Sequence, residues 1–196
     1  GETDDSPHHR QITPKGLRSF DAGDADFFLQ LLPGPRDREG LPRQIRFLKN
    51  RIEQTDAPQT FTVGLLYGPS GCGKSSLVKA GLLPRLANEV AVAYVKALYR
   101  QWRELPAETA LPELIAHLRT GGGSRGRKVL LVIDQFEQWL HAHAANSESQ
   151  LAAALRQCDG RHVQCLLLVR DDFWMSLSRF MQSLEVPLVE GFNCAA

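Results

Sequence analysis

The residues Gly68-Pro69-Ser70-Gly71-Cys72-Gly73-Lys74-Ser75 form the pattern G-x-x-x-x-G-K-[ST], which is the strongest indication of the fold in this sequence. The apolar run 61–67 before it is predicted to be a buried strand, and residues 76–80 after it the first turns of a helix. Glycines let the backbone curl so that successive N–H groups point inward at phosphate oxygens, and the start of the helix adds partial positive charge. This strand–loop–helix order predicts a triphosphate-binding loop rather than an ordinary glycine turn.

The loop also predicts contacts with a nucleoside triphosphate and Mg²⁺. Lys74 is expected to reach the terminal phosphates, and the Ser75 hydroxyl to hold the metal ion. The predicted nucleotide-binding residues are those of the loop and the one that follows it: Gly68, Pro69, Ser70, Gly71, Cys72, Gly73, Lys74, Ser75 and Ser76.

The composition narrows the class of protein. A chain of 196 residues with 43% hydrophobic and 23% charged residues is typical of one soluble globular domain. A formal net charge of +1 gives no electrostatic argument for nucleic acid or an anionic membrane. No apolar stretch approaches the roughly 18 residues that a membrane helix needs, so we expect no membrane partner. The four cysteines form no CxxC pair, which predicts reduced thiols in the cytoplasm.

Strand and helix patterns alternate along the chain, which predicts an α/β fold with a doubly wound parallel sheet. Besides the strand before the loop, we expect strands at 90–97, 129–133 and 163–169, and helices at 43–53, 74–83, 111–119, 136–141 and 150–157. A last helix after Asp172 carries an apolar stripe expected to lie in the core: Phe173, Trp174, Leu177, Phe180, Met181 and Leu184. The predicted organisation is a flexible lead-in at 1–15, an entry segment with an amphipathic helix at 16–58, and a phosphate-loop core at 59–196.

A second motif follows the phosphate loop, and it ends in a carboxylate. The apolar strand 129–133 ends in Asp134, and a bound triphosphate with Mg²⁺ needs such a carboxylate near the metal; a helix-capping aspartate is the alternative. Glu137 is a candidate general base for the attacking water, or else a surface residue that suits the helix dipole. Gln135 is either a water-positioning group or a solvent-exposed one.

Arg170 ends the strand 163–169. If that strand lies between the loop strand and the Asp134 strand, the guanidinium faces the terminal phosphate. There it would neutralise charge that develops during hydrolysis and report whether the third phosphate is present. A salt bridge to Asp171, Asp172 or another neighbour is the open alternative.

Together these motifs resemble a known family. Residues 68–84 resemble the NTPase domain of STAND proteins, the signal-transduction ATPases with numerous domains, in the branch often fused to WD40 or other repeats and to effectors. Asp134-Gln135-Phe136-Glu137 resembles the acidic motif of that branch, and residues 167–173 are similar to its strand ending in a sensor Arg. The segments 16–20 and 24–28 resemble its entry segment, so the likeness runs from Lys15 to about Met175.

The resemblance implies a three-layer sandwich with strand order 5-1-4-3-2, whose fifth strand is missing or incomplete because the chain stops at Ala196. It implies that Asp134 serves Mg²⁺, that Glu137 activates water and that Arg170 senses the terminal phosphate. It also implies a switch between ATP and ADP, effector and repeat-sensor domains on the same polypeptide, and a nucleotide-dependent homo-oligomer. The chain is then expected to be an excised piece that ends before a helical lid and a winged-helix region.

The sequence departs from the family pattern at a segment that bears on recognition of the nucleotide base. The Gly-Arg-Glu that follows Phe-Phe in the family is absent, and residues 29–42 replace it, with Arg36, Arg38 and Glu39 as imperfect substitutes. Recognition of adenine therefore rests on the resemblance alone.

The leading function is an ATP-binding, slowly hydrolysing domain of a regulatory ATPase. An ABC-transporter ATPase would need Leu-Ser-Gly-Gly-Gln, and a GTPase would need Asn-Lys-x-Asp; neither is present. A nucleotide kinase and a non-hydrolysing scaffold stabilised by bound nucleotide remain as alternatives.

Overall fold

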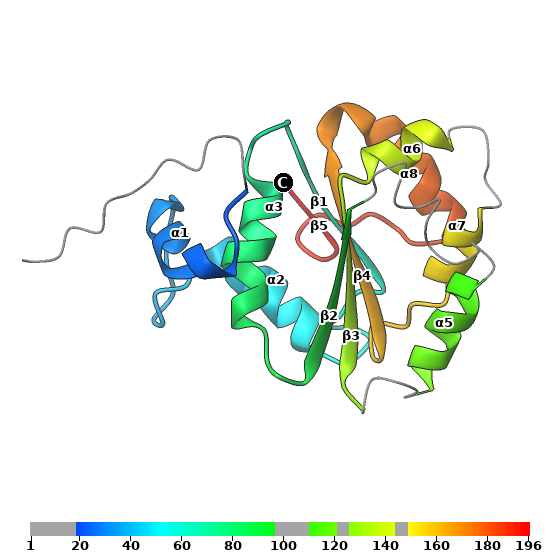
Figure 1. The fold of residues 1–196 in the computed structure, drawn as a ribbon, viewed down its shortest axis with the longest axis horizontal. Coiled ribbons are helices and arrows are strands. Elements are labelled where there is room, and N and C mark those ends of the chain that lie inside the picture. The colour runs from blue at the N-terminus through cyan, green and yellow to red at the C-terminus, as the bar shows by residue number, and fades with distance from the viewer. Residues whose placement is uncertain (1–18, 97–109, 121–125, 144–148) are drawn as a thin grey trace, which may run out of the picture.

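The computed structural model describes residues 19–96, 110–120, 126–143 and 149–196, and its centre is a parallel β-sheet (Figure 1). The sheet has five strands in the order β2-β3-β4-β1-β5. They are β1 (Val63–Gly68), β2 (Val90–Lys96), β3 (Lys128–Asp134), β4 (Val163–Arg170) and β5 (Cys194–Ala195). The predicted order 5-1-4-3-2 is therefore confirmed, and the fifth strand is a short one that pairs with β1 over two residues.

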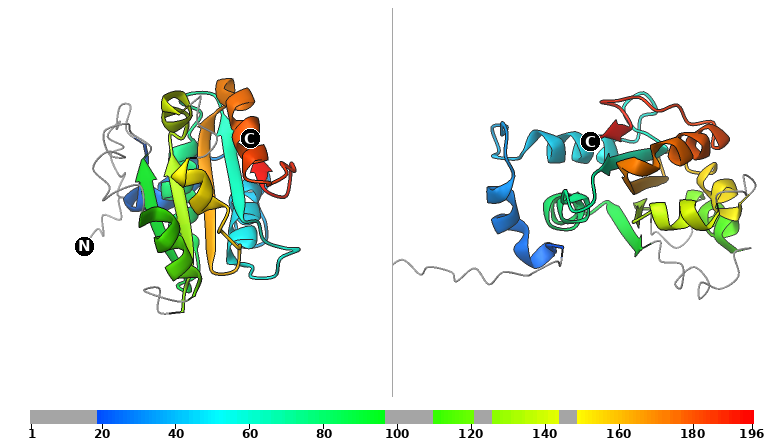
Figure 2. Two further views of the ribbon diagram at one scale, coloured as in Figure 1. Left: turned by 90° about the vertical axis from the view of Figure 1, so that its right-hand side faces the viewer. Right: turned by 90° about the horizontal axis from the view of Figure 1, so that it is seen from above.

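Helices cover both faces of the sheet, as Figures 1 and 2 show. One face is covered by α2 (Arg43–Glu53) and by α3 (Lys74–Ser76) with its continuation, against which α1 (Ala25–Leu31) packs. The other face carries α5 (Ala110–Arg119), α6 (Glu137–Ala142), α7 (Gln150–Leu155) and α8 (Trp174–Ser183). The three-layer α/β sandwich matches the sequence-based expectation. Within the described residues, none of the helices has both the length and the apolar character that crossing a bilayer requires.

The alternating sides of each strand supply two separate hydrophobic cores. Leu167 and Val169 of β4 lie in the cluster under α5–α8, whereas Leu166 and Leu168 lie in the cluster under α2 and the helix after the loop. Side chains of successive strand residues point to opposite faces, so a strand covered on both sides is expected to be mostly apolar. This explains why the continuous apolar runs of the sequence are central strands.

The helix after the phosphate loop is irregular. The prediction was one helix over 74–83, but α3 passes into a π-helical segment η2 (Leu77–Leu82) and then a 3-10 turn η3 (Leu83–Arg85). Four residues of η2 are buried, including Gly81, on which Phe28 and Ile45 pack closely. Pro84, which lacks a backbone N–H, lies within η3, and the helical segment ends there, near the residue that the sequence predicted.

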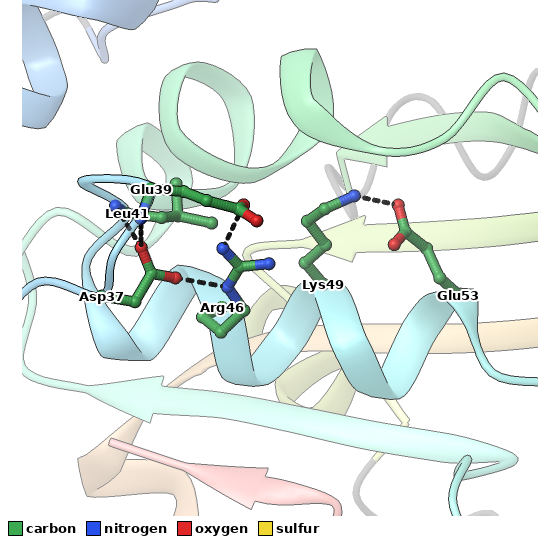
Figure 3. A network of polar contacts seen from close by, with 6 residues as sticks. All are labelled: Asp37, Glu39, Leu41, Arg46, Lys49 and Glu53. Carbon is green, nitrogen blue, oxygen red and sulfur yellow. Dashed lines mark hydrogen bonds and ion pairs between the residues drawn. The ribbon is translucent and has the colours of Figure 1, made fainter.

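The amphipathic helix α2 has the predicted bounds, and its residues Ile45, Leu48 and Ile52 are buried. Its polar side holds the preceding connection in place (Figure 3). Arg46 donates to Asp37 at 2.5 Å and also pairs with Glu39. The Arg46 guanidinium, with backbone N–H groups, lowers the pKa of Asp37.

The last helix is confirmed, but two of the six residues expected in its core face are not buried: Phe173 is only partly buried, and Trp174 is exposed. A 3-10 turn η4 (Asp171–Phe173) precedes α8, in which Leu177, Phe180 and Met181 are buried, as is Leu184 just after it. Trp174 was expected in the core but is 37% exposed. It occupies the first position of α8, just after the carboxyl end of β4, where its ring packs at 5.0 Å against Tyr67.

Candidate functional site

The phosphate loop lies at the carboxyl edge of the sheet, between the end of β1 and the start of α3. Gly68, Gly71 and Gly73 have φ angles of 152°, 78° and 97°. Residues with a side chain are strained at such angles, so the spacing of the glycines matches the curvature of the loop.

Lys74 begins α3 and folds its side chain back over the loop. Its Nζ donates to the carbonyl oxygens of Gly68 at 2.7 Å and Pro69 at 2.8 Å. The thiol of Cys72 lies 3.6 Å from the same ammonium. The positive charge of Lys74 is therefore held at the centre of the loop.

Asp134 and Ser75 lie in contact although they are distant in the sequence. The Ser75 Oγ is 2.9 Å from each carboxylate oxygen of Asp134, and the backbone N–H of Gln135 donates to Oδ1 at 2.9 Å. A hydroxyl and a carboxylate are hard oxygen ligands, which fit Mg²⁺. Among the residues that the structure describes, no group of three or more His, Cys, Asp or Glu side chains forms another candidate metal site.

Tyr94 is a site residue that the sequence reasoning missed. Its hydroxyl donates to Oδ2 of Asp134 at 2.7 Å. Burial raises the pKa of Tyr94, and its hydrogen bond to Asp134 raises the pKa further, so the phenol stays protonated and acts as a donor. The contact depends on the register that pairs β2 with β3, in which Tyr94 is opposite Val132. The sequence pattern of residues 90–97 carries no signal of this register.

Glu137 is buried beneath the site. It begins α6, is 8% exposed, and its Oε2 accepts a 3.4 Å hydrogen bond from the backbone N–H of Arg170. The sharp turn before it is made by Gln135, which is exposed and has a φ of 58°. The N–H of Phe136 donates to the carbonyl of Leu168 at 2.9 Å and fixes this turn to β4. Glu137 is thus not the surface residue of the alternative interpretation.

Arg170 ends β4, which lies between β1 and β3. Its Nη2 donates to Oδ2 of Asp172 at 2.6 Å, so the ion pair that the sequence left open is present. The side chains of Arg170 and Asp172 are 42% and 51% exposed. Its Nε, in contrast, is buried and has no hydrogen-bond partner among the described residues.

One cavity of about 830 Å³ joins these groups. Its walls include Asp134, Glu137 and Arg170 from the ends of β3 and β4, together with Gln135. From the loop and its helix they include six of the nine predicted residues: Ser70, Gly71, Gly73, Lys74, Ser75 and Ser76. Gly68, Pro69 and Cys72, the other three predicted residues, are not among the lining residues.

The N-terminal segment forms another wall of the cavity that site prediction missed. Ser19, Phe20 and Phe28 line it, as do Lys79 and Lys96. The N–H of Phe20 donates to Ser76 Oγ at 3.1 Å, and Lys79 Nζ lies 3.4 Å from Ser19 Oγ. Only the resemblance of residues 16–20 and 24–28 to a family entry segment pointed to this region.

The suggested substitutes for the family's Gly-Arg-Glu have other partners. Arg36 donates to the carbonyl oxygens of Leu29 at 2.5 Å and Gly40 at 3.1 Å, and Glu39 pairs with Arg46 (Figure 3). Neither residue lines the described cavity, and nor does Arg38, which is exposed. Arg36 and Glu39 stabilise the connection between α1 and α2 instead.

The model of a protein family described as Novel STAND NTPase 1 matches residues 15–190. No curated protein matches the sequence. Among solved structures, the cytoplasmic domain of the Thermomonospora curvata Type VII secretion ATPase EccC is 17% identical, with a TM-score of 0.38 over 64% of this chain. The match covers 19% of that structure, so this chain spans only a small part of its length.

Proposed function

The chain belongs to the Novel STAND NTPase 1 family, and we propose that it is the ATP-binding switch domain of a larger signalling ATPase. The observation that carries the proposal is the meeting of Ser75 with Asp134 at 2.9 Å in a cavity that Arg170 also lines. Three segments far apart in the chain thereby contribute a phosphate loop, an acidic group and a cation to one site.

Each group has a part in binding the nucleotide. The loop N–H groups and Lys74 would hold the phosphates, because they combine backbone donors with a fixed positive charge. Ser75 and Asp134 would hold Mg²⁺, which neutralises phosphate charge when bound. The assignment of ATP rather than another triphosphate follows the family resemblance.

Hydrolysis would use Glu137 and Arg170, which also line the cavity. The Glu137 carboxylate would take the proton of a water whose oxygen attacks the terminal phosphorus as the bond to ADP breaks. The Arg170 guanidinium would stabilise the charge on the transferred phosphate. Exposed ion pairs are worth about 0–1 kcal/mol, so leaving Asp172 for a phosphate costs Arg170 little.

The same exchange supplies a switch. With ATP, Arg170 would bind the third phosphate; with ADP it would return to Asp172, 2.6 Å away in the structure. We propose that this change is passed to effector and repeat-sensor domains and to a nucleotide-dependent homo-oligomer. All four cysteines are free thiols, which suits the proposed cytoplasmic location.

Single-turnover hydrolysis tests the proposal. With protein in excess over ATP, the chain should cleave the nucleotide slowly, and Glu137→Gln should lower the rate by about 100-fold or more, as loss of a general base does. Glu89→Gln, which makes the same change at an exposed position, should leave the rate unchanged. Uncleaved ATP retained over hours, with no effect of Glu137→Gln, would indicate the scaffold function instead. Phosphate transfer to GMP would indicate a nucleotide kinase.

A further inference from the structure

Tyr94 contacts the carboxylate that is proposed to hold Mg²⁺, and its role goes beyond the motifs of the family resemblance. We propose that Tyr94 is a positioning residue, which fixes the Asp134 carboxylate so that Ser75 and Asp134 can bind Mg²⁺ together. This inference rests on the proposed function of the site.

The hydrogen bonds around Asp134 show why a separate donor is needed. Oδ1 accepts from the N–H of Gln135 at 2.9 Å, and Oδ2 accepts from the Tyr94 hydroxyl at 2.7 Å. The Ser75 Oγ lies 2.9 Å from both oxygens, but a hydroxyl has one proton and can donate to only one oxygen at a time. Tyr94 is therefore the donor that keeps Oδ2 in place whichever way the serine hydroxyl turns.

The Tyr94 hydroxyl is itself well fixed. Its strand, β2, pairs with β3 along its whole length, from Val90 opposite Lys128 to Lys96 opposite Asp134. The Lys79 ammonium lies 4.8 Å from the centre of the Tyr94 ring, within the range of a cation–π contact. The strand pairing and the lysine both restrict the position of the ring, so the hydroxyl is held by contacts besides its hydrogen bond to the carboxylate.

A role in orienting a metal ligand predicts a specific defect. Loss of a residue that orients a metal ligand typically weakens metal binding about 10- to 100-fold, whereas the phosphate contacts of the loop do not pass through Tyr94. The quantity to measure is the ratio between the Kd of ADP in EDTA and its Kd with saturating MgCl₂. In Tyr94→Phe we expect this ratio to fall about tenfold, while the Kd in EDTA stays within about twofold of wild type.

The experiment is isothermal titration of ADP into the chain and its variants, with and without MgCl₂. Tyr67→Phe is the matched control, because it removes the same hydroxyl on β1 from a ring that packs on Trp174 and does not line the cavity. This control should keep the wild-type ratio. Tyr94→Phe removes one oxygen and leaves the ring beneath Lys79, and the melting temperature without nucleotide checks that the fold is kept.

The possible outcomes separate the two proposals. If wild type shows a strong magnesium dependence and Tyr94→Phe retains or increases it, the positioning role is wrong and the proposed function stands. An equal loss of ADP affinity with and without MgCl₂ would also overturn the positioning role, since it would reveal a general structural effect. If wild type does not bind ADP under either condition, both proposals fail.

Discussion

The Oγ of Ser75 lies 2.9 Å from both carboxylate oxygens of Asp134, although 59 residues separate them in the chain. Ser75 follows β1 and Asp134 ends β3, and in the sheet β4 lies between these two strands. The contact forms because α3 starts directly after the loop at the edge where β3 also ends, so the order of the strands determines the position of the proposed metal site.

Replacing the carboxylate tests that site. Asp134→Asn should retain binding of ADP in EDTA but lose most of the additional affinity that Mg²⁺ provides, because an amide lacks the charge that the metal requires. A change of about tenfold or more in the ratio of the two Kd values is expected. Asp56→Asn, an exposed position between α2 and β1, is the control. Equal magnesium dependence in Asp134→Asn and wild type would exclude Asp134 as the metal-binding group.

Releasing Arg170 from its ion pair should favour ATP over ADP. Asp172 accepts a 2.6 Å hydrogen bond from the guanidinium and so competes with the third phosphate for Arg170. Asp172→Asn removes the negative charge and weakens this competition. Because an exposed ion pair is worth up to about 1 kcal/mol, we expect the preference for ATP to rise by up to about fivefold. Arg170→Ala should abolish most of the preference. Competition binding of both nucleotides measures it, and a lower preference in Asp172→Asn would contradict the sensor role.

Two glycines with similar backbone angles predict different effects on stability. Gly160 and Gly126 have φ of 72° and 76°, but a Cβ on Gly160 would lie 2.9 Å from the carbonyl oxygen of Phe61, whereas one on Gly126 would meet no atom of the described residues within 4 Å. Both alanine variants carry the strain of about 1–2 kcal/mol of a left-handed residue. Gly160→Ala should lose a further 1–3 kcal/mol or so from overpacking. Urea unfolding measures both, and similar losses would show that the contact at Gly160 relaxes freely.

Lys128 should make stability depend on pH in the alkaline range. It is 7% exposed, its Nζ donates to the carbonyl of Gln54 at 2.7 Å, and burial lowers the pKa of Lys128 from 10.5 to about 8. Between these two values the unfolded chain holds more protons than the folded one, so the contribution of Lys128 to the free energy of unfolding rises with pH.

Comparison with Lys128→Met isolates this contribution from other groups that titrate in the same range. From about pH 8 to pH 10, we expect wild type to gain about 1–2 kcal/mol of unfolding free energy relative to the variant, allowing for partial solvation of the ammonium. Urea unfolding at several pH values measures the difference. Parallel pH profiles for the two proteins would contradict the prediction.

Much of the fold was predictable because each element has a local signal. The mostly apolar run 163–169 indicates a strand buried on both faces, and Ile45, Leu48 and Ile52 recur at helical spacing. The phosphate loop carries its own glycine pattern. The strand order was predicted from the family resemblance rather than from any local pattern, and the structure confirms this order.

The features that were missed depend on contacts between elements. Tyr94 reaches Asp134 only because β2 and β3 adopt one particular register, and Phe20 lines the cavity only because its segment packs on the helix after the loop. Trp174 shares the apolar spacing of the α8 core face, but its position at the start of the helix leaves it partly exposed. Periodicity identifies a face of an element and not what covers it.

Thermal unfolding with Mg-ATP tests whether this pocket binds a nucleoside triphosphate. At about a hundredfold excess of nucleotide over its Kd, binding adds about 2.7 kcal/mol to the free energy of unfolding. In a chain of this size that corresponds to a rise in Tm of roughly 5–10 °C. We expect this rise in wild type and not in Lys74→Ala, which lacks the charge at the centre of the loop. No rise in wild type, or an equal rise in Lys74→Ala, would contradict nucleotide binding in this pocket.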